Sequence, residues 1–223
     1  MSEVLFRLSD VSFSYDPQRP VLRAADFELW RGDRVALVGR NGAGKTTLFH
    51  LMVGLRKADA GTIEAFGKQR AAEQDFVEVR ARAGLLFQDS DDQLFCPTVA
   101  EDVAFGPLNL GKSTAEAQAI VRRTLDSLGL TGFENRITHK LSGGQKRLVA
   151  LASVLAMEPD VLLLDEPTNA LDAETEVRFT DILRTLPQSL IMISHDEDFL
   201  ACIANRRVRL DGGKLVDQPL SAA

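Results

Sequence analysis

The feature that most constrains this chain is a glycine-rich run that fits the spacing G-x-x-x-x-G-K-[ST] of a phosphate-binding loop: Gly39-Arg40-Asn41-Gly42-Ala43-Gly44-Lys45-Thr46-Thr47. The apolar run 35–38 predicts a buried strand before the loop, and residues 48–53 predict a helix after it. Glycines let the backbone curl so that successive N–H groups point at an anion, and the helix N-terminus adds unpaired donors. Lys45 can then reach the β- and γ-phosphates of a nucleotide, and the Thr46 hydroxyl can ligate Mg²⁺.

Composition limits what surrounds this loop. A chain of 223 residues can form one large domain or two small ones, and its net charge of −6 argues against a surface that coats nucleic acid. The two cysteines, Cys96 and Cys202, lack metal-ligand spacing and indicate a reducing compartment. We find no signal-peptide pattern at the start and no apolar run near the roughly 18 residues that span a bilayer. If the protein acts at a membrane, another chain is expected to hold it there.

The strand pattern predicts an α/β fold with a mainly parallel core sheet. Residues 5–10, 11–15 and 21–30 have β-favouring character and predict an N-terminal antiparallel subdomain. Three later apolar runs resemble 35–38 and predict parallel strands that are buried on both faces; they are 84–87, 161–164 and 190–193.

Polar residues follow each of these three later runs. Ligands in open α/β sheets bind at the carboxyl ends of strands. We therefore expect Gln88, Asp165, Glu166 and His195 to converge on the phosphate site around Lys45.

The segment from about 89 to 158 changes character and predicts a helical subdomain inserted into the α/β core. Residues 98–105 and 113–128 predict helices. Ser113 with Glu116 forms a capping box for the second, and Gly129 is a suitable C-cap. Near the C-terminus, residues 206–216 predict a small hairpin around an Asp-Gly-Gly turn.

Two acidic residues follow the run 161–164. Asp165 at the strand end can hold Mg²⁺, and Glu166 can polarise a water molecule aimed at the γ-phosphate. The alternative is that an acidic residue after a strand merely caps the next turn. Beside a phosphate loop, the catalytic interpretation is favoured.

A second donor loop opens the helical run 146–156 with the sequence Leu141-Ser142-Gly143-Gly144-Gln145. Its backbone N–H groups form a possible second anion site, although an ordinary serine cap would give the same pattern. Because the phosphate loop already encloses one side of the nucleotide, this second loop fits best against the γ-phosphate of a nucleotide held by another copy. The arrangement predicts a dimer with two ATP molecules at its interface.

Taken in order, these motifs resemble those of ATP-binding-cassette (ABC) ATPase subunits over almost the whole chain. The resemblance implies a P-loop NTPase fold, one ABC ATPase domain over residues 1–223, and ATP hydrolysis coupled to transport. It further implies a peripheral location at the cytoplasmic face of the cell membrane, a second ATPase subunit, integral membrane partners, and no nucleic acid.

The resemblance also implies roles for single residues. Lys45 and Thr46 match the Walker A motif, and Asp165 matches Walker B. Glu166 matches the catalytic base, Gln88 the Q-loop glutamine and His195 the switch histidine. Residues 141–145 match the ABC signature, and residues 170–172 match the D-loop. The implied catalytic set is Gln88, Glu166 and His195, and the implied Mg²⁺ set is Thr46, Gln88 and Asp165. The implied ATP-binding set is Tyr15, Gly39, Asn41, Gly42, Ala43, Gly44, Lys45, Thr46, Thr47, Ser142, Gly143, Gly144 and Gln145.

Several of these residues also have a plain structural interpretation. Tyr15 matches the aromatic that stacks on adenine, but a tyrosine on a strand often only packs; His195 alone would more often be structural. His50 and His139 are interpreted as structural, and Cys96 as a small packing residue rather than a ligand. Asn169 receives no role; it precedes the D-loop, where small residues are common.

The residues around Gln88 suggest a subfamily. The runs 87–95, 97–99 and 101–107 resemble the energy-coupling-factor importers for cobalt, nickel or vitamins such as biotin. Many of those ATPases carry an extra C-terminal domain, whereas this chain ends soon after its predicted hairpin, which favours a compact single-domain subunit in a homodimer. The alternatives are a soluble ABC ATPase in translation or DNA maintenance, and a nucleotide switch with little turnover. The first would need a second cassette or a long coiled coil, which the sequence lacks, and Glu166 and His195 argue against the second.

The segment after Gln88 predicts a partner surface. Residues 91–95 are expected to form part of a groove that receives a helix from a membrane subunit. Leu94 and Phe95 are the expected apolar anchors, with ordinary core packing as the alternative.

Overall fold

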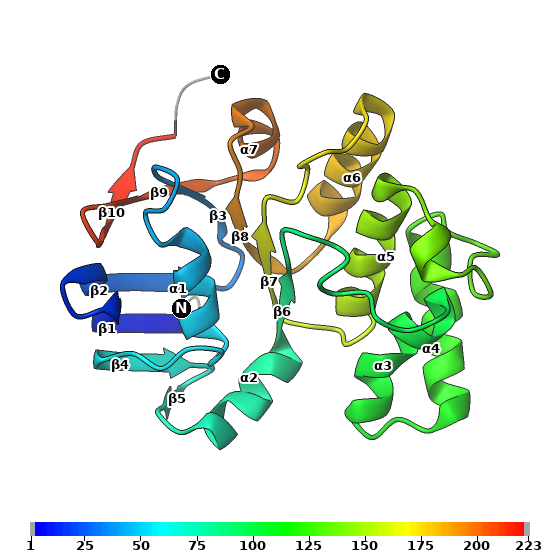
Figure 1. Cartoon of the computed structure of the whole chain (residues 1–223), viewed down its shortest axis with the longest axis horizontal. Helices are drawn as coiled ribbons and strands as arrows, with labels where there is room; N and C mark the ends of the chain where they lie inside the picture. Colours follow the sequence, from blue (N-terminus) through cyan, green and yellow to red (C-terminus); the bar gives the residue numbers. More distant parts are fainter. Residues whose placement is uncertain (1–2, 221–223) are drawn as a thin grey trace.

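The computed structural model describes residues 3–220 and contains two β-sheets (Figure 1). The antiparallel sheet has the order β2-β1-β4-β5, formed by β1 (Val4–Asp16), β2 (Arg19–Trp30), β4 (Ala60–Ala65) and β5 (Lys68–Arg70). The six-stranded sheet has the order β10-β9-β3-β8-β7-β6, formed by β3 (Arg34–Val38), β6 (Ala83–Leu86), β7 (Val161–Asp165), β8 (Ser189–Ile193), β9 (Arg206–Asp211) and β10 (Lys214–Gln218). Its neighbours are parallel except for the β9–β10 hairpin.

The central strands of the six-stranded sheet are buried on both faces, as their unbroken apolar sequences predict. In β7, Val161 and Leu163 pack into the cluster shared with the antiparallel sheet. Leu162 and Leu164 point to the opposite face and pack into the cluster with the helices. Successive strand residues point to opposite faces, so two cores require apolar residues at every position.

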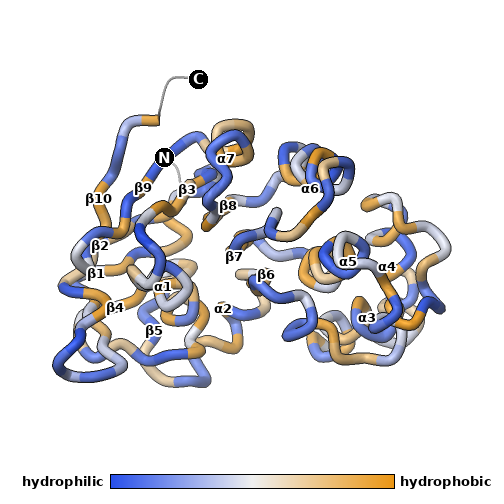
Figure 2. Tube along the Cα trace, turned by 45° about the horizontal axis from the view of Figure 1, so that its top comes forward, coloured by the Kyte–Doolittle hydropathy of each residue, from blue (hydrophilic) through white to orange (hydrophobic). Residues whose placement is uncertain are grey.

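The helices divide between these two faces. Beside the antiparallel sheet lie α1 (Lys45–Met52) and α2 (Phe76–Arg82). The opposite cluster draws on α3 (Val99–Asn109), α4 (Thr114–Ser127), α5 (Gly143–Leu155), α6 (Ala173–Thr185) and α7 (Glu197–Ile203). Short 3₁₀ helices cover Glu73–Asp75 and Thr138–Lys140. In Figure 1 the antiparallel sheet and α3–α5 lie on opposite sides of the parallel strands. Figure 2 colours the trace by hydropathy, and hydrophobic and hydrophilic residues are interspersed on both sides. Across residues 3–220, no helix combines the length and apolar character that a membrane span needs.

Local signals predicted several helix ends correctly. The Ser113–Glu116 capping box is formed, with the Ser113 N–H donating to Glu116 Oε2 at 2.8 Å, and Gly129 adopts a φ of 63° just after α4. One close contact also depends on a glycine. A Cβ on Gly84 in β6 would lie 2.1 Å from Val154 Cγ1, so the glycine lets α5 approach the sheet.

Four features differ from the sequence prediction. The strands expected at 5–10 and 11–15 are one strand with an irregularity at Asp10, whose φ is 52°. β4 and β5 were missed because they contain few buried apolar residues. The helix expected at 98–105 continues through Pro107 to Asn109. The C-terminal hairpin exists, but β9 also pairs with β3 and so extends the main sheet.

Candidate active site

The glycine-rich loop joins β3 to α1 and owes its shape to glycines at positions where a side chain would be strained or would make a close contact. Gly42 and Gly44 have φ values of 74° and 106°, in the region that side chains disfavour. A Cβ on Gly39 would lie 2.6 Å from the Leu210 carbonyl oxygen, and one on Gly44 would lie 2.3 Å from Val21 Cγ1. The loop therefore curls tightly against β2 and β9, with its backbone N–H groups at the start of α1.

Lys45 lies at the centre of this loop and is only 8% exposed. Its Nζ donates to the carbonyl oxygens of Gly39 at 2.8 Å and Arg40 at 3.3 Å. The side chain lines a cavity of about 740 Å³ together with Asn41, Gly42 and other residues of the loop. A positive charge in a glycine-rich loop at a helix N-terminus is suited to an anion such as a polyphosphate.

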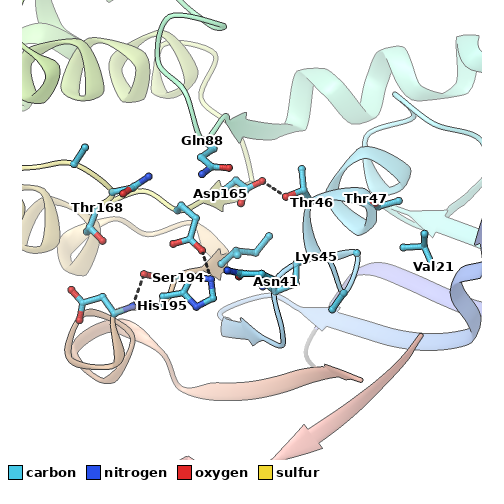
Figure 3. A pocket seen from close by; sticks show the side chains of 18 of the residues that line it. Val21, Asn41, Lys45, Thr46, Thr47, Gln88, Asp165, Thr168, Ser194 and His195 are labelled. Carbon is cyan, nitrogen blue, oxygen red and sulfur yellow. Dashed lines mark hydrogen bonds and ion pairs between the residues drawn. The ribbon is translucent and has the colours of Figure 1, made fainter. Parts of the chain in front are cut away.

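The end of β7 meets the first turn of α1 in the same cavity. The Thr46 hydroxyl donates to Asp165 Oδ2 at 2.6 Å, and Gln88, after β6, lines the cavity beside them (Figure 3). A hydroxyl, a carboxylate and a side-chain amide supply the oxygen ligands that Mg²⁺ prefers, with phosphate oxygens and water completing the shell. The residues present therefore fit a magnesium ion shared with a nucleotide.

Glu166 follows Asp165 and lines the same cavity as His195, with 3.3 Å between its Oε1 and the His195 Nε2. Its N–H donates to the Ile193 carbonyl oxygen at 2.8 Å, and its φ of 45° is unusual for a residue with a side chain. Burial raises the pKa of the Glu166 carboxyl, an effect that His195 opposes. A carboxylate with a raised pKa is a better proton acceptor than an ordinary surface glutamate.

Tyr15 lies at the rim of the cavity, and its ring is largely available for contact, with 58% of the residue exposed. Its hydroxyl lies 3.2 Å from Thr47 Oγ1, and its ring packs edge-on against Phe13 with centroids 4.9 Å apart. The Arg56 guanidinium lies 5.4 Å from the ring centroid. The ring is thus held over the start of α1, and stacking on a base stays a prediction.

The second donor loop lies elsewhere. Ser142 caps α5: its Oγ accepts from the Gln145 N–H at 3.3 Å, and its own N–H donates to Gln145 Oε1 at 3.2 Å. Ser142, Gly144 and Gln145 are absent from the lining of the cavity around Lys45, and Gly143 lines a neighbouring cavity of about 1000 Å³. Within one chain the structure unites the residues expected around Lys45. Of the donor loop only Gly143 lines the neighbouring cavity, which Thr46, Gln88 and Asp165 also line.

The two glycines of that loop have different surroundings. A Cβ on Gly144 would lie 2.8 Å from Thr175 Cγ2, so packing against α6 explains this glycine. A Cβ on Gly143 would meet nothing within 4 Å. Internal packing therefore gives no reason for a glycine at position 143.

The structure corrects one expected anchor of the partner groove. Leu94 is only 9% exposed and belongs to the core around the helices, because its N–H bonds back to the Ser90 carbonyl oxygen in a tight turn. Phe95 is 65% exposed and packs edge-on against Phe105, with ring centroids 4.8 Å apart. Leu94 as a surface anchor was therefore wrong, whereas Phe95 is available at the surface.

Other side chains near the site have clearer surroundings in three dimensions. His50 lines the second cavity, and burial lowers its pKa, which keeps it neutral at pH 7. Asn169 lines both cavities. The Cys96 thiol, whose pKa is raised by burial to about 11, is poorly reactive. Sequence analysis missed Arg147, a buried arginine whose only signal is a charge within the apolar face of a helix.

Comparison with known proteins agrees with this geometry. A family model described as ABC transporter matches residues 22–169. The energy-coupling factor transporter ATP-binding protein EcfA of Methanothermobacter thermautotrophicus is 43% identical over 216 residues, covering 95% of this chain and 70% of that protein. A provisionally named ABC transporter ATP-binding protein of Nitratidesulfovibrio vulgaris is 50% identical over 210 residues, covering 94% and 77%.

Two solved structures have similar folds. cbiO1 from Clostridium perfringens, described as part of the ABC transporter complex cbiONQ, has a TM-score of 0.86 and 31% identity, covering 96% of this chain and 87% of that one. The ATP-binding cassette MJ0796, solved as a dimer bound to ADP and Pi, has a TM-score of 0.87 and covers 98% and 100%. Its identity is 23%, so this second likeness concerns the fold.

Proposed function

The chain belongs to the ABC transporter family of ATP-binding proteins, and from this premise we propose that it hydrolyses ATP to drive solute import through an energy-coupling-factor type of membrane complex. It has the P-loop NTPase fold of that family and is an ABC-type ATPase domain. The proposal rests above all on one observation, the convergence of Lys45, the Thr46–Asp165 pair and the Glu166–His195 pair on a single cavity. A transition metal such as cobalt or nickel, or a vitamin such as biotin, is the proposed solute, on the resemblance of residues 87–95, 97–99 and 101–107 to the energy-coupling-factor importers.

In this proposal each residue of the cavity has a task in hydrolysis. The loop N–H groups and Lys45 bind the β- and γ-phosphates, and Tyr15 offers its exposed ring to the base. Thr46, Asp165 and Gln88 would hold Mg²⁺, which when bound neutralises charge on the phosphates.

Proton transfer falls to the Glu166–His195 pair. Glu166 accepts a proton from the attacking water, helped by the raised pKa of its carboxyl. His195 is held 3.3 Å from Glu166, where it orients the carboxylate and can contact the γ-phosphate.

This assignment is tested by steady-state phosphate release. Replacing Glu166 by glutamine keeps the shape but removes the base, which should lower kcat by about 10²–10⁴-fold. Glu158→Gln is the matched control, since Glu158 pairs with Arg123 at the surface and lies outside the cavity lining. Equal turnover in both variants would refute the role of Glu166.

A second copy of the chain completes the site. The donor loop around Gly143 is absent from the lining of the Lys45 cavity of its own chain, so in this proposal its first-turn N–H groups bind a γ-phosphate held by another protomer. The Glu166→Gln variant should accumulate this ATP-bound dimer. Light scattering with and without ATP and Mg²⁺ measures it, and a monomer in both conditions, with ATP shown to be bound, would contradict the composite site.

The membrane partner docks beside the segment that follows the Q-loop glutamine, Gln88. This partner holds the chain at the cytoplasmic face of the membrane. The cavity of about 1000 Å³ is lined by the carboxylates of Asp89, Asp91 and Asp92. The positively charged Lys146 lines the same cavity. Phe95 follows Asp92 by three residues, and its exposed ring packs against the exposed ring of Phe105. Acidic and aromatic groups together suit a partner helix with basic and apolar side chains. In this proposal residues 1–223 form one domain, in which about 89–158 form the helical subdomain that carries motion to the partner.

Surface substitutions test this docking site. Phe95→Ser with Phe105→Ser should leave ATP binding unchanged but abolish co-purification of membrane subunits and transport. The matched control is Val77→Ser with Val177→Ser, which replaces two exposed apolar residues on α2 and α6. Intact partner binding in the phenylalanine variant would show that the partner docks elsewhere.

A further inference from the structure

Arg147 lies in the first half of α5, two residues after the second donor loop, and is only 3% exposed. Its guanidinium donates to five backbone carbonyl oxygens. Nε donates to Pro167 at 2.8 Å; Nη2 donates to Asp165 at 3.0 Å and Glu166 at 2.8 Å; Nη1 donates to Phe87 and, at 3.3 Å, to Gln88. One side chain thus joins α5, the segment after β6 and the segment after β7.

The contact to Glu166 bears on catalysis. With a φ of 45°, Glu166 adopts the left-handed conformation, which is unfavourable for a residue with a side chain. Both of its backbone groups are held: the N–H donates to Ile193 on β8, and the carbonyl oxygen accepts from Arg147 Nη2. Since the backbone conformation sets the direction of the side chain, these two bonds aim the carboxylate at His195.

Arg147 remains charged inside the protein. Burial lowers the pKa of its guanidinium to about 10, an effect opposed by Asp165, Asp89 and Glu166. The group is therefore protonated at neutral pH, and its hydrogen bonds are charge-assisted, which makes each roughly twice as strong as a neutral one.

Two further contacts tie α5 to the segment after β6. Lys146 pairs with Asp91, and Gln93 Nε2 donates to the Ala150 carbonyl oxygen at 2.9 Å. Arg147 differs from both because it also reaches the backbone of Glu166. A displacement of α5 would consequently reach the catalytic carboxylate through this guanidinium.

We propose that Arg147 is a positioning residue for hydrolysis, which holds the Glu166 backbone in the conformation that aims its carboxylate and makes that aim depend on the position of α5. The inference rests on the proposed function in which Glu166 is the base. Arg147 acts through Glu166 and requires no contact with ATP. A misplacement of about 1 Å at a reacting group can lower the rate by about 10²-fold.

The test combines Arg147→Met with Glu166→Gln. Arg147→Met should lower kcat about 10²-fold while the Kd for ATP changes less than about threefold, because Lys45 and Tyr15 are untouched. In the double variant, kcat should be no lower than in Glu166→Gln alone. Glu166→Gln has already removed the base, so the loss of the residue that positions this base has no further effect. Arg147→Lys, with three donors for five acceptors, should give an intermediate kcat.

Arg70→Met supplies the matched control. Arg70 is also buried and donates to the carbonyl oxygens of Ala65 and Asp75, but it lies in β5 outside the cavity around Lys45. The Arg70→Met variant should lower the Tm, as we also expect for Arg147→Met, but should leave kcat unchanged. The comparison separates an effect on the position of Glu166 from an effect on stability.

Three outcomes overturn the proposal. The first is full kcat in a folded Arg147→Met protein, and the second is losses that multiply with Glu166→Gln. The third is failure of both Arg147 variants to fold, which would make the guanidinium a requirement of the fold. If Arg147→Met alone fails to fold, the same cycle is run with Arg147→Lys. Failure of the proposed function is recognised separately, as wild-type hydrolysis that is unaffected by Glu166→Gln.

Discussion

The Gly143→Asp substitution should weaken contact with a second copy of the chain while it leaves the stability of a single chain largely unchanged. Gly143 is the first residue of α5, and a Cβ there would meet nothing within 4 Å. A carboxylate at a helix N-terminus is stabilised by about 0.3–1 kcal/mol, and loss of glycine flexibility adds up to about 1 kcal/mol. Asp89, Asp91 and Asp92 line the same cavity as Gly143 and oppose this gain, so the isolated variant should unfold close to the temperature of the wild type.

The effect on the dimer should be large and opposite in sign. If the N-terminus of α5 binds the γ-phosphate of the partner's ATP, the new carboxylate lies within about 4–6 Å of that phosphate. At an effective dielectric constant of about 20, two like charges at this separation repel by roughly 3–4 kcal/mol. This corresponds to about 10²–10³-fold weaker ATP-dependent dimerisation, with a similar loss of hydrolysis.

The assay measures dimerisation by light scattering in the Glu166→Gln background and phosphate release in the wild-type background. Gly143→Ala is the matched control, since it adds the same Cβ without the charge and should retain both activities within a few fold. Normal ATP-dependent dimerisation of Gly143→Asp would refute the composite site. An equal loss in Gly143→Ala would show that shape, and not charge, is the constraint.

The other predictions concern the loop, the base and the core. Lys45→Ala removes a charge-assisted hydrogen bond of about 1.5–3 kcal/mol, so a fluorescent ATP analogue should bind about one to two decades more weakly, and unchanged hydrolysis would contradict the loop assignment. Because burial raises the pKa of Glu166 above its unfolded value, ionising this group costs stability as pH rises through the folded pKa. Glu166→Gln should therefore raise the Tm at pH 7 but not below the unfolded pKa near 4; an equal shift at both pH values would refute this. Gly84→Ala places a Cβ against Val154, so denaturant unfolding should show about 1–3 kcal/mol of lost stability, partly restored by Val154→Ala; no recovery would locate the strain elsewhere.

Several features of this protein were predictable from sequence because their causes lie within a few residues. The start of α1 follows from the loop glycines, and the caps of α4 and α5 follow from Ser113 and Ser142 with their partners three residues later. The buried parallel strands follow from apolar residues at consecutive positions. Parallel strands end at the same edge of a sheet, and this rule predicted that Gln88, Asp165 and His195, which follow or end these strands, would converge.

Only the tertiary structure decided which segments pair and which side chains turn inward. Leu94 and Phe95 are adjacent and similarly apolar, yet one is core and the other surface, because the turn at Ser90 and the packing of α3 and α5 set their directions. The pairing of β9 with β3 joins segments about 170 residues apart, so no local pattern could reveal it. The role inferred for Arg147 depends on carbonyl oxygens from two other segments. Backbone carbonyls are the same in every residue, so the partners of such a side chain leave no trace in the sequence and exist only once distant segments have packed together.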